Sequence, residues 1–507
     1  MNEENTYNLI VEPWIPVLMR DGNNRSVSLG DIFADANGTI ADLALNPYER
    51  VAVFRLLLCI AQAALGPERL KDETAWKAAK ADVGPVATDY LKKWHDRFFF
   101  YGTHAFLQPD DVVAVNESSY KPYSTLVFEL ASGNNSTLFD HGAADPLRVI
   151  SQVDIVINFI TYQNFSANGL SGKCLWSGKE TEKSVKGAPC REQSMLFALL
   201  CGKSIIESIW LNLVTCEQVK NDLQAEWGRP AWELNSLSRS DSKIIPETFL
   251  GHLVPLSRSI KFKEGASKCI LGGGLVYPQL PSWREQMASV IMKDDGSPAY
   301  ISANPSRMPW RDLSSILSVH GTGMCKGALA LRHIGSLSEE DNFGIWTGGI
   351  KWEPGQAKLI DTVEWSTNLS VSMIEDLSLQ RYESAIKWAE SQKSSLRYAA
   401  KAYAGILKVD DASRYYQPAE RAYWDILAQP ENQKLVLSVD SPTYLDDWKR
   451  ACREAAEAAY RQACPAMNAR QMEAFAQGFA KLWVPDRKKD KVAGGTDSEE
   501  DEGGDNA

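Results

Sequence analysis

Tyr382-Glu-Ser-Ala-Ile-Lys-Trp-Ala-Glu390 belongs to a long stretch of sequence with helical character. Its apolar residues recur three and four positions apart, which is the period of one helix face. From Leu369 to Trp483 the chain is rich in Ala, Leu, Glu, Lys and Arg, and the pattern breaks near residues 407–411 and at two prolines. Such breaks indicate four or five helices with short connections, the form of an antiparallel bundle. We therefore predict a C-terminal four-helix bundle over residues 369–485.

Residues 1–368 have a different character, because strand-like and helix-like segments are mixed. The fold class predicted for the whole chain is α+β, with a large mixed N-terminal domain of strands and helices followed by the antiparallel helical bundle. The length of 507 residues agrees with this division, since it exceeds what a single core usually supports.

Several segments of the mixed domain carry their own predictions. Residues 7–29 read as a strand hairpin, and Asn46 caps a helix over residues 50–65. The apolar run 194–213 predicts a helix followed by a strand, and residues 123–130 predict a short strand.

The charge of the chain is acidic, and part of that charge is local. The net charge is −11, which argues against a protein coated with phosphate-neutralising Lys and Arg. Residues 496–507 contain six acidic residues and no basic one, so −5 remains for the rest of the chain. Residues 486–507 are charged, glycine-rich and free of aromatic residues, which predicts a disordered acidic tail. Nucleic-acid binding would then require a local basic surface.

Cysteine usage and hydropathy give the expected compartment. The nine Cys are dispersed without a C-x-x-C pair, which indicates reduced thiols and disfavours a zinc site. The N-terminal residues lack the basic and apolar regions of a signal peptide, and no apolar run reaches the length of a membrane span. We expect a cytoplasmic protein with no membrane partner.

A polar loop at residues 132–145 is a candidate functional segment. Gly133 and the two asparagines after it favour a turn, and Phe139 lies beside an adjacent acid–imidazole pair, Asp140-His141. One reading is a surface connection, and another is a metal-dependent nuclease or hydrolase built on this pair. Because no P-loop, nucleophile elbow, H-E-x-x-H or kinase motif occurs, we predict no enzymatic activity, no catalytic residue, no cofactor and no metal site.

A second loop, at residues 164–191, combines glycine with lysine. It carries four Lys and one Arg against two Glu. Backbone amides in a Gly/Ser/Asn loop can approach a phosphate or a base edge closely, and the lysines add electrostatic attraction. A solvated disordered loop is the alternative.

Four motifs taken together resemble one protein family. They are Asn8-Leu-Ile-x-x-Pro-Trp-Ile-Pro-Val17, Ser132-Gly-Asn-Asn-Ser-Thr-Leu-Phe-Asp-His141, Arg307-Met-Pro-Trp-Arg-Asp-Leu313, and Gly348-Gly-Ile with Gln356-Ala-Lys358. In this order, and together with the C-terminal helices, they are similar to the CasA family, the large subunits of the type I-E CRISPR surveillance complex Cascade.

The resemblance implies a non-catalytic subunit of a ribonucleoprotein in antiviral defence. Such a subunit recognises the protospacer-adjacent motif in double-stranded target DNA, starts strand separation for R-loop formation and supports recruitment of the CRISPR helicase-nuclease. Its implied partners are the guide RNA and the backbone, small and 5′-end-binding subunits of Cascade. A purely structural scaffold subunit is the alternative.

The resemblance also implies roles for particular residues. The glycine loop of the family corresponds to Asn168, Gly169, Leu170, Ser171 and Gly172. The DNA-contacting lysine corresponds to Lys268, in preference to Lys261 and Lys263. The wedge turn corresponds to Gly355, Gln356 and Ala357, although Glu353-Pro354 lengthens it. The docking loop, which would anchor on a neighbouring subunit or the 5′ end of the guide RNA, contains Asn134, Asn135, Phe139, Asp140 and His141.

Overall fold

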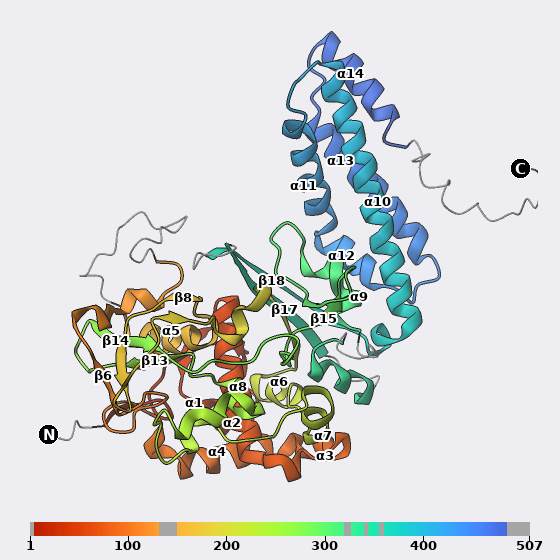
Figure 1. Cartoon of the computed structure of the whole chain (residues 1–507). Helices are drawn as coiled ribbons and strands as arrows, with labels where there is room; N and C mark the ends of the chain where they lie inside the picture. Colours follow the sequence, from red (N-terminus) through yellow and green to blue (C-terminus); the bar gives the residue numbers. More distant parts are fainter. Residues whose placement is uncertain (1–4, 131–149, 319–325, 339–342, 354–358, 484–507) are drawn as a thin grey trace, which may run out of the picture. The chain divides into compact units, whose positions relative to one another are not determined.

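The computed structural model describes residues 5–130, 150–318, 326–338, 343–353 and 359–483 (Figure 1). The chain divides into two compact units, Met1–Ile374 and Glu375–Ala507. The division lies a few residues after the predicted one, because a 3-10 turn, Val371–Ile374, separates strand β18 (Leu359–Leu369) from the first helix of the second unit. The predicted mixture of helices and strands is confirmed.

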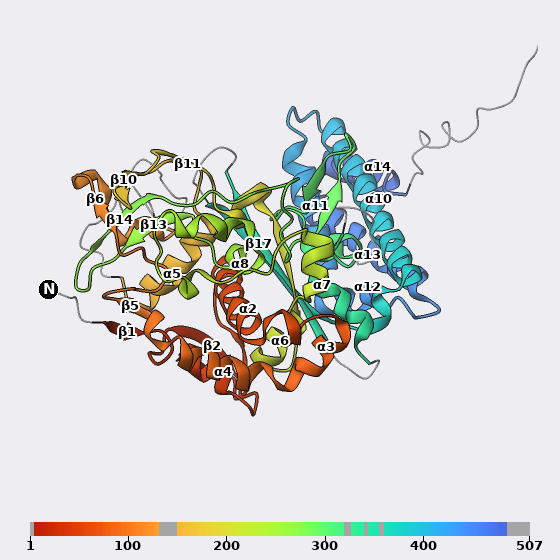
Figure 2. The ribbon, with the colours of Figure 1, turned by 60° about the horizontal axis from the view of Figure 1, so that its bottom comes forward.

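Helix α2 (Pro47–Arg69) is the central helix of the first unit (Figures 1 and 2). Its length and apolar composition would suit a membrane span, but 72% of its most apolar window is buried inside the protein. The helix begins as predicted, with the Asn46 backbone N–H donating to Glu49 Oε2 at 3.1 Å. Gly66, at φ 71°, interrupts it where the sequence predicts its end. Buried Arg55 pairs with Glu285 at 2.5 Å within this core.

Other helices and small antiparallel sheets surround α2. Helices α4, α5, α6 and α8 and strand β17 contact it. The remaining helices of this unit are α1 (Leu29–Ala34), α3 (Glu73–Ala78), α4 (Val83–Lys93), α5 (Gln152–Phe165), α6 (Ile205–Leu211), α7 (Cys216–Gln218), α8 (Phe249–Leu253) and α9 (Leu313–Ile316). Short 3-10 turns connect many of them.

The strands of the described residues form seven small antiparallel sheets. Three pairs are β1 (Thr6–Asn8) with β5 (Phe99–Tyr101), β8 (Gly169–Leu170) with β11 (Ser184–Val185), and β15 (Val290–Met292) with β16 (Pro298–Tyr300). The three-stranded sheets are β3 (Asn24–Val27), β2 (Ile15–Met19) and β4 (Ile40–Leu43); β10 (Lys179–Glu180), β9 (Cys174–Trp176) and β6 (Val112–Ala114); β13 (Arg258–Lys261), β14 (Lys268–Gly273) and β7 (Tyr120–Pro122); and β12 (Leu196–Cys201), β17 (Phe343–Trp352) and β18. The predicted N-terminal hairpin is confirmed as β2 and β3.

Two local predictions were wrong. Residues 194–213 form strand β12 and then helix α6, which is the reverse of the predicted order. A fully apolar run has no distinguishing period, and the signal that marks the helix start is Ser204, whose side chain accepts from the Glu207 N–H. Residues 123–130 contain a 3-10 turn, Tyr123–Leu126, instead of a strand, because the strand that pairs with β14 is the preceding β7.

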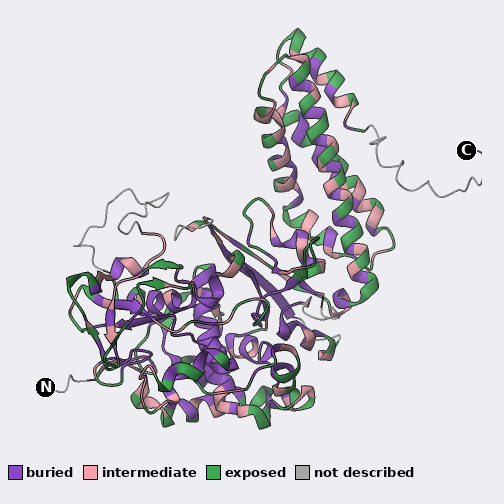
Figure 3. Ribbon diagram, viewed as in Figure 1, coloured by how far each residue is buried: buried purple, intermediate pink, exposed green. Residues whose placement is uncertain are grey.

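The second unit is helical in its described part. It consists of α10 (Asp376–Ile406), α11 (Ser413–Leu427), α12 (Pro430–Leu437), α13 (Tyr444–Ala463) and α14 (Ala469–Ala480). Helix α10 contacts α11, α13 and α14, and buried residues recur along each of these helices (Figure 3). Large aromatic residues pack against small ones: Trp448 Nε1 donates to the Ala385 carbonyl at 2.8 Å, and the Tyr423 hydroxyl donates to the Ala389 carbonyl at 2.9 Å. Alanine on α10 therefore allows the close approach of aromatic rings.

Candidate nucleic-acid interface

The predicted glycine loop, residues 168–172, follows helix α5 and opens a folded double hairpin. Strand β8 pairs with β11, which brings Gly169 opposite Val185. Gly169 has φ 133°, a conformation that L side chains rarely adopt. A Cβ on Gly172 would lie 2.7 Å from the Leu271 carbonyl oxygen, so only glycine allows the loop to approach β14 this closely. Leu170 is 79% exposed at the tip. The loop therefore presents backbone and one apolar side chain to solvent.

The lysines of this hairpin stand on an ordered scaffold. Cys174 and Trp176 of β9 are buried with Val112 in a small apolar cluster. Lys173 pairs with Glu180 at 2.9 Å. The other three, Lys179, Lys183 and Lys186, are exposed and make no ion pair with any residue in the described part of the chain. The hairpin is thus a basic surface on a folded support, and the solvated disordered loop is not what the structure contains.

Lys268 is the first residue of β14, and it is exposed. The same strand supplies Leu271, whose carbonyl faces Gly172 of the glycine loop. The structure therefore places the glycine loop against the strand that begins with Lys268. The Lys261 side chain donates to the Asp110 carbonyl, whereas Lys268 makes no ion pair within the described ranges.

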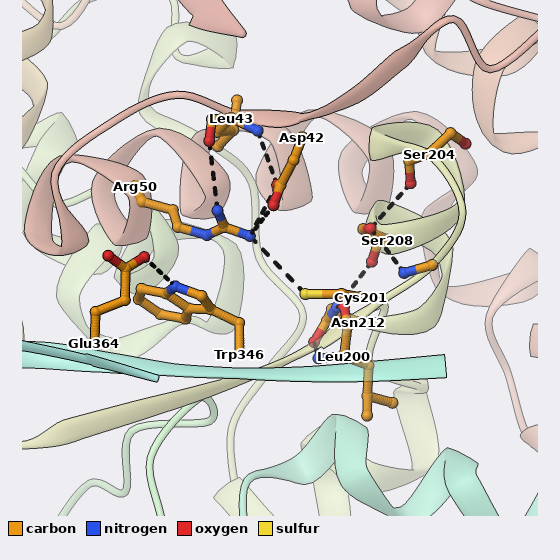
Figure 4. Close-up of polar contacts among 11 residues, drawn as sticks. Asp42, Leu43, Arg50, Leu200, Cys201, Ser204, Ser208, Asn212, Trp346 and Glu364 are labelled. Carbon is orange, nitrogen blue, oxygen red and sulfur yellow. Dashed lines mark hydrogen bonds and ion pairs between the residues drawn. The ribbon is translucent and has the colours of Figure 1, made fainter. Parts of the chain in front are cut away.

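The predicted wedge residues Gly355, Gln356 and Ala357 lie outside the described residues. The two strands that flank them, β17 and β18, are described, and their pairing extends to Trp352 and Leu359. This hairpin is attached to the core at its middle (Figure 4). Arg50 of α2 lies over the Trp346 ring at 4.9 Å and pairs with Asp42 at 2.8 Å. The Trp346 indole donates to Glu364 at 2.6 Å, which joins the two strands across the hairpin.

Trp352 anchors the same hairpin nearer its turn. Its ring stacks under the Arg191 guanidinium, with 3.7 Å from Cζ to the ring centroid. Its backbone N–H donates to Ser194 Oγ at 3.2 Å, and Phe128 packs edge-on against it at 5.2 Å. Phe128 also stacks on Tyr162 of α5 at 5.7 Å. A cluster of aromatic residues and one arginine therefore holds the end of strand β17.

Two buried arginines hold the start of the glycine loop. Arg191 donates to the Phe165 carbonyl at 3.4 Å, and Arg258 donates to the Ala167 carbonyl. Burial lowers the pKa of Arg191 to about 10, a value that leaves it charged at neutral pH, and burial also lowers the pKa of Arg258. Burial raises the pKa of the neighbouring Tyr162 phenol, so that side chain stays neutral.

The docking-loop residues Asn134, Asn135, Phe139, Asp140 and His141 also lie outside the described residues. The segment before them is described. There Glu129 accepts from the Asn46 amide at 3.4 Å, and burial raises the pKa of its carboxyl. Within the described ranges, no group of three His, Cys, Asp or Glu side chains is arranged to hold a metal ion.

Comparison with known proteins identifies the family. The model of the CRISPR-associated protein Cse1 family matches residues 8–459. This chain belongs to the Cse1 (CasA) family. The CRISPR-associated protein CasA/Cse1 of Thermus thermophilus is 28% identical over 501 residues, which cover 93% of this chain and 95% of that protein. The membership expected from the four motifs is confirmed.

Solved structures agree with this assignment of the Cse1 fold. The structure of Thermus thermophilus CasA (Cse1) matches with a TM-score of 0.76 at 25% identity, over 94% of this chain and 98% of that one. Thermobifida fusca Cse1 matches with a TM-score of 0.76 at 19% identity, over 94% and 98%. A chain of a CRISPR RNA-guided surveillance complex matches with a TM-score of 0.70 at 16% identity, over 95% and 100%.

Sequence reasoning missed part of the site of this Cse1 protein. Arg191 counted only as the one Arg of the loop at residues 164–191, and Trp352 carried no prediction of its own. Arg258 was not singled out. These residues lie far apart in the chain, and no local pattern indicates that Arg191 and Trp352 stack. The sequence signal for this contact is limited to the presence of an arginine and a tryptophan in two glycine-containing segments.

Proposed function

We propose that this Cse1 protein is the non-catalytic large subunit of a type I-E CRISPR RNA-guided surveillance complex, and that it recognises the protospacer-adjacent motif in double-stranded DNA and starts strand separation for R-loop formation. One observation carries the proposal. The glycine loop meets β14 through Gly172 and Leu271, and Lys268 begins that strand, so a backbone reader packs against the strand that carries a cation. DNA binding requires only a local basic surface, so the net charge of −11 for the whole chain is compatible with the proposal.

The chemistry of this surface suits the minor groove. Minor-groove edges offer few distinguishing groups, so backbone and lysine contacts read them with limited selectivity. Strand separation requires unstacking, which costs roughly a few kcal/mol per base step. A wedge must therefore be rigidly supported, and the anchors at Trp346 and Trp352 give such support to the hairpin that carries Gln356. Pairing with the guide RNA would then read the remaining sequence.

The partners follow from the same proposal. The target is double-stranded DNA, and the complex contains the guide RNA with the backbone, small and 5′-end-binding subunits. The similarity to a chain of a CRISPR RNA-guided surveillance complex supports this assembly. We assign residues 132–141 to docking on a neighbouring subunit or the guide RNA, and helices α10, α11, α13 and α14 to an antiparallel four-helix bundle. Recruitment of the helicase-nuclease in the cytoplasm completes the proposed antiviral role.

Substitutions in the assembled complex test the proposal. Gln356→Ala and Lys268→Ala should each weaken binding to motif-bearing duplex DNA and leave binding to single-stranded target unchanged, because the latter needs no strand separation. The matched control is Lys293→Ala, an exposed lysine on the β15–β16 turn. Equal affinity of variants and wild type for the duplex would instead favour a purely structural scaffold subunit. Equal losses on both substrates would contradict the reader and wedge roles.

A further inference from the structure

Arg191 contacts at the same time the end of strand β17, beside the segment of the proposed wedge, and the end of helix α5, before the glycine loop. It lies in the 3-10 turn Pro189–Ser194 and is 9% exposed. Its guanidinium stacks on Trp352, two residues before the segment that carries the proposed wedge, and its Nη1 donates to the Phe165 carbonyl before the glycine loop. Its aliphatic stem lies beside Gly187, where a Cβ would be 3.9 Å from Arg191 Cδ and 3.6 Å from the Asn168 backbone nitrogen. One side chain thus bridges the hairpin and the loop.

Arg258 holds the other side of the loop without reaching the hairpin. Its guanidinium donates to the Ala167 and Ser257 carbonyls. Its own backbone exchanges two hydrogen bonds of 2.9 Å with the Gln163 side chain, which fixes β13 to α5. The Ala188 N–H donates to the Ser166 carbonyl at 2.9 Å. The entry of the glycine loop is therefore tied to α5 and β13, and among the described residues Arg191 joins this entry to Trp352.

The chemistry of arginine suits a bridge of this kind. A planar guanidinium can stack its face on an indole while its N–H groups donate in the plane to carbonyls. Lysine keeps the charge but has a compact ammonium that cannot do both. Stacking of a cation on Trp is strongest where water is excluded, as it is around this buried residue.

We propose that Arg191 is a positioning residue that couples the glycine loop to the β17–β18 hairpin, so that both engage the DNA duplex as one unit. The inference rests on the proposed function of these two elements. When the glycine loop binds the edge of a base pair, Arg191 maintains the distance between the Phe165 carbonyl, which precedes the loop, and the Trp352 ring. The hairpin is then presented at a fixed offset from the base pair being read.

The test uses the assembled ribonucleoprotein with Arg191→Lys. Binding is measured on a motif-bearing duplex, on a duplex without the motif, and on a target whose strands are already separated at that position. We expect about a tenfold loss on the motif-bearing duplex, the size of a desolvated stacking contact, with little change on the pre-separated target. The discrimination between the two duplexes should fall as well. Lys268→Ala should cost less in the Arg191→Lys background than in wild type, because coupled residues are not additive.

Arg239→Lys is the matched control. Arg239 also donates to a carbonyl of the lysine hairpin, that of Glu180 at 3.3 Å, but it is not stacked on Trp352. The affinity of the Arg239→Lys complex for each of the three substrates should stay within about twofold of wild type, as expected for a surface contact. Arg191→Ala removes both contacts and should show the larger loss. If it fails to assemble, the lysine variant carries the test.

Two results would overturn the inference: unchanged duplex binding by Arg191→Lys, or equal losses on the duplex and the pre-separated target, which would indicate a folding or assembly defect. The failure of the proposed function is recognised separately, by unchanged duplex binding of Lys268→Ala and Gln356→Ala. If those two variants lose duplex binding and Arg191→Lys does not, only the coupling is wrong.

Discussion

Buried His333 pairs with partly exposed Glu73, and the imidazole Nδ1 lies 2.9 Å from a Glu73 carboxylate oxygen. The other ring nitrogen, Nε2, lies 2.8 Å from the Leu213 carbonyl oxygen. Each ring nitrogen therefore lies within hydrogen-bond distance of an acceptor. The ring also stacks on Trp76, with 4.0 Å between the ring centroids. Three distant segments of the first unit are joined at this point.

The Glu73 carboxylate makes the stability of this unit dependent on pH. Partial burial raises its pKa, but the hydrogen bonds from His333 and Ser336 and the electrostatic effects of His333 and Lys77 together outweigh burial, so the net shift of the pKa is downward. A lowered folded-state pKa contributes stability above the unfolded value of about 4.3 and loses it as the pH falls through the folded value. We expect Glu73→Gln to lower the thermal midpoint at pH 7 and to have little effect near pH 3. Melting curves of both proteins across this range check the sign; a difference that grows toward acid would contradict it.

Removal of the Arg55 guanidinium should be among the most destabilising changes in the first unit. The side chains of Arg55 and Glu285 are 1% and 3% exposed, and Arg55 also donates to the Leu253 and His252 carbonyls. Arg55→Met leaves a buried carboxylate without its partner, which costs about 3–5 kcal/mol. Urea unfolding followed by Trp fluorescence measures the loss. The control is Arg25→Met, whose pair with Asp21 has exposures of 60% and 51% and should contribute under about 1 kcal/mol.

Gly172→Ala should weaken recognition of motif-bearing duplex. The new methyl group would lie 2.7 Å from the Leu271 carbonyl oxygen and 3.2 Å from that of Ser118, so the glycine loop would have to move away from β14 and Lys268. Affinity of the assembled complex for duplex and for pre-separated target provides the measurement, with the loss expected on the duplex. Gly405→Ala is the control, because that position in α10 has open space around it. A Gly172→Ala complex with wild-type duplex affinity would show that the contact with β14 is unimportant for reading.

The exposed lysines of the double hairpin should contribute sequence-independent attraction. Lys179→Gln, Lys183→Gln and Lys186→Gln should each weaken duplex binding similarly with and without the motif, because phosphate contacts carry no sequence information. Each lysine that neutralises a phosphate should reduce the slope of log affinity against log salt by about 0.9. Lys173→Gln should change the slope less, since Lys173 already pairs with Glu180 at 2.9 Å. A salt series on the four variants checks this; slopes equal to wild type would place the hairpin away from the DNA.

Helix caps and turn residues correctly predicted the ends of some helices and strands, because these ends depend on residues that are neighbours in the sequence. Asn46, Pro47 and Gly66 mark the ends of α2, and the turn after Met19 joins β2 to β3. The run from Ser194 to Leu213 was predicted in the wrong order, because its apolar residues fit a buried strand and a buried helix equally well. What decides that case is the pairing of β12 with β17, which lies about 150 positions further along the chain, as in the register of Leu196 with Gly349.

The sequence alone determined the family, the change to helical pattern near residue 369, and the glycine loop and Lys268 as candidate readers. The helical pattern follows from periodicity, whereas the family and the candidate readers follow from the resemblance of sequence motifs to the CasA family. Both kinds of signal lie in neighbouring positions. The tertiary structure alone decided that Gly172 meets β14, that Arg191 stacks on Trp352, and that His333 lies between Glu73 and Leu213. Such contacts join residues from distant parts of the chain. They arise from the close packing of side chains around α2, and no local pattern encodes which distant pairs that packing brings together.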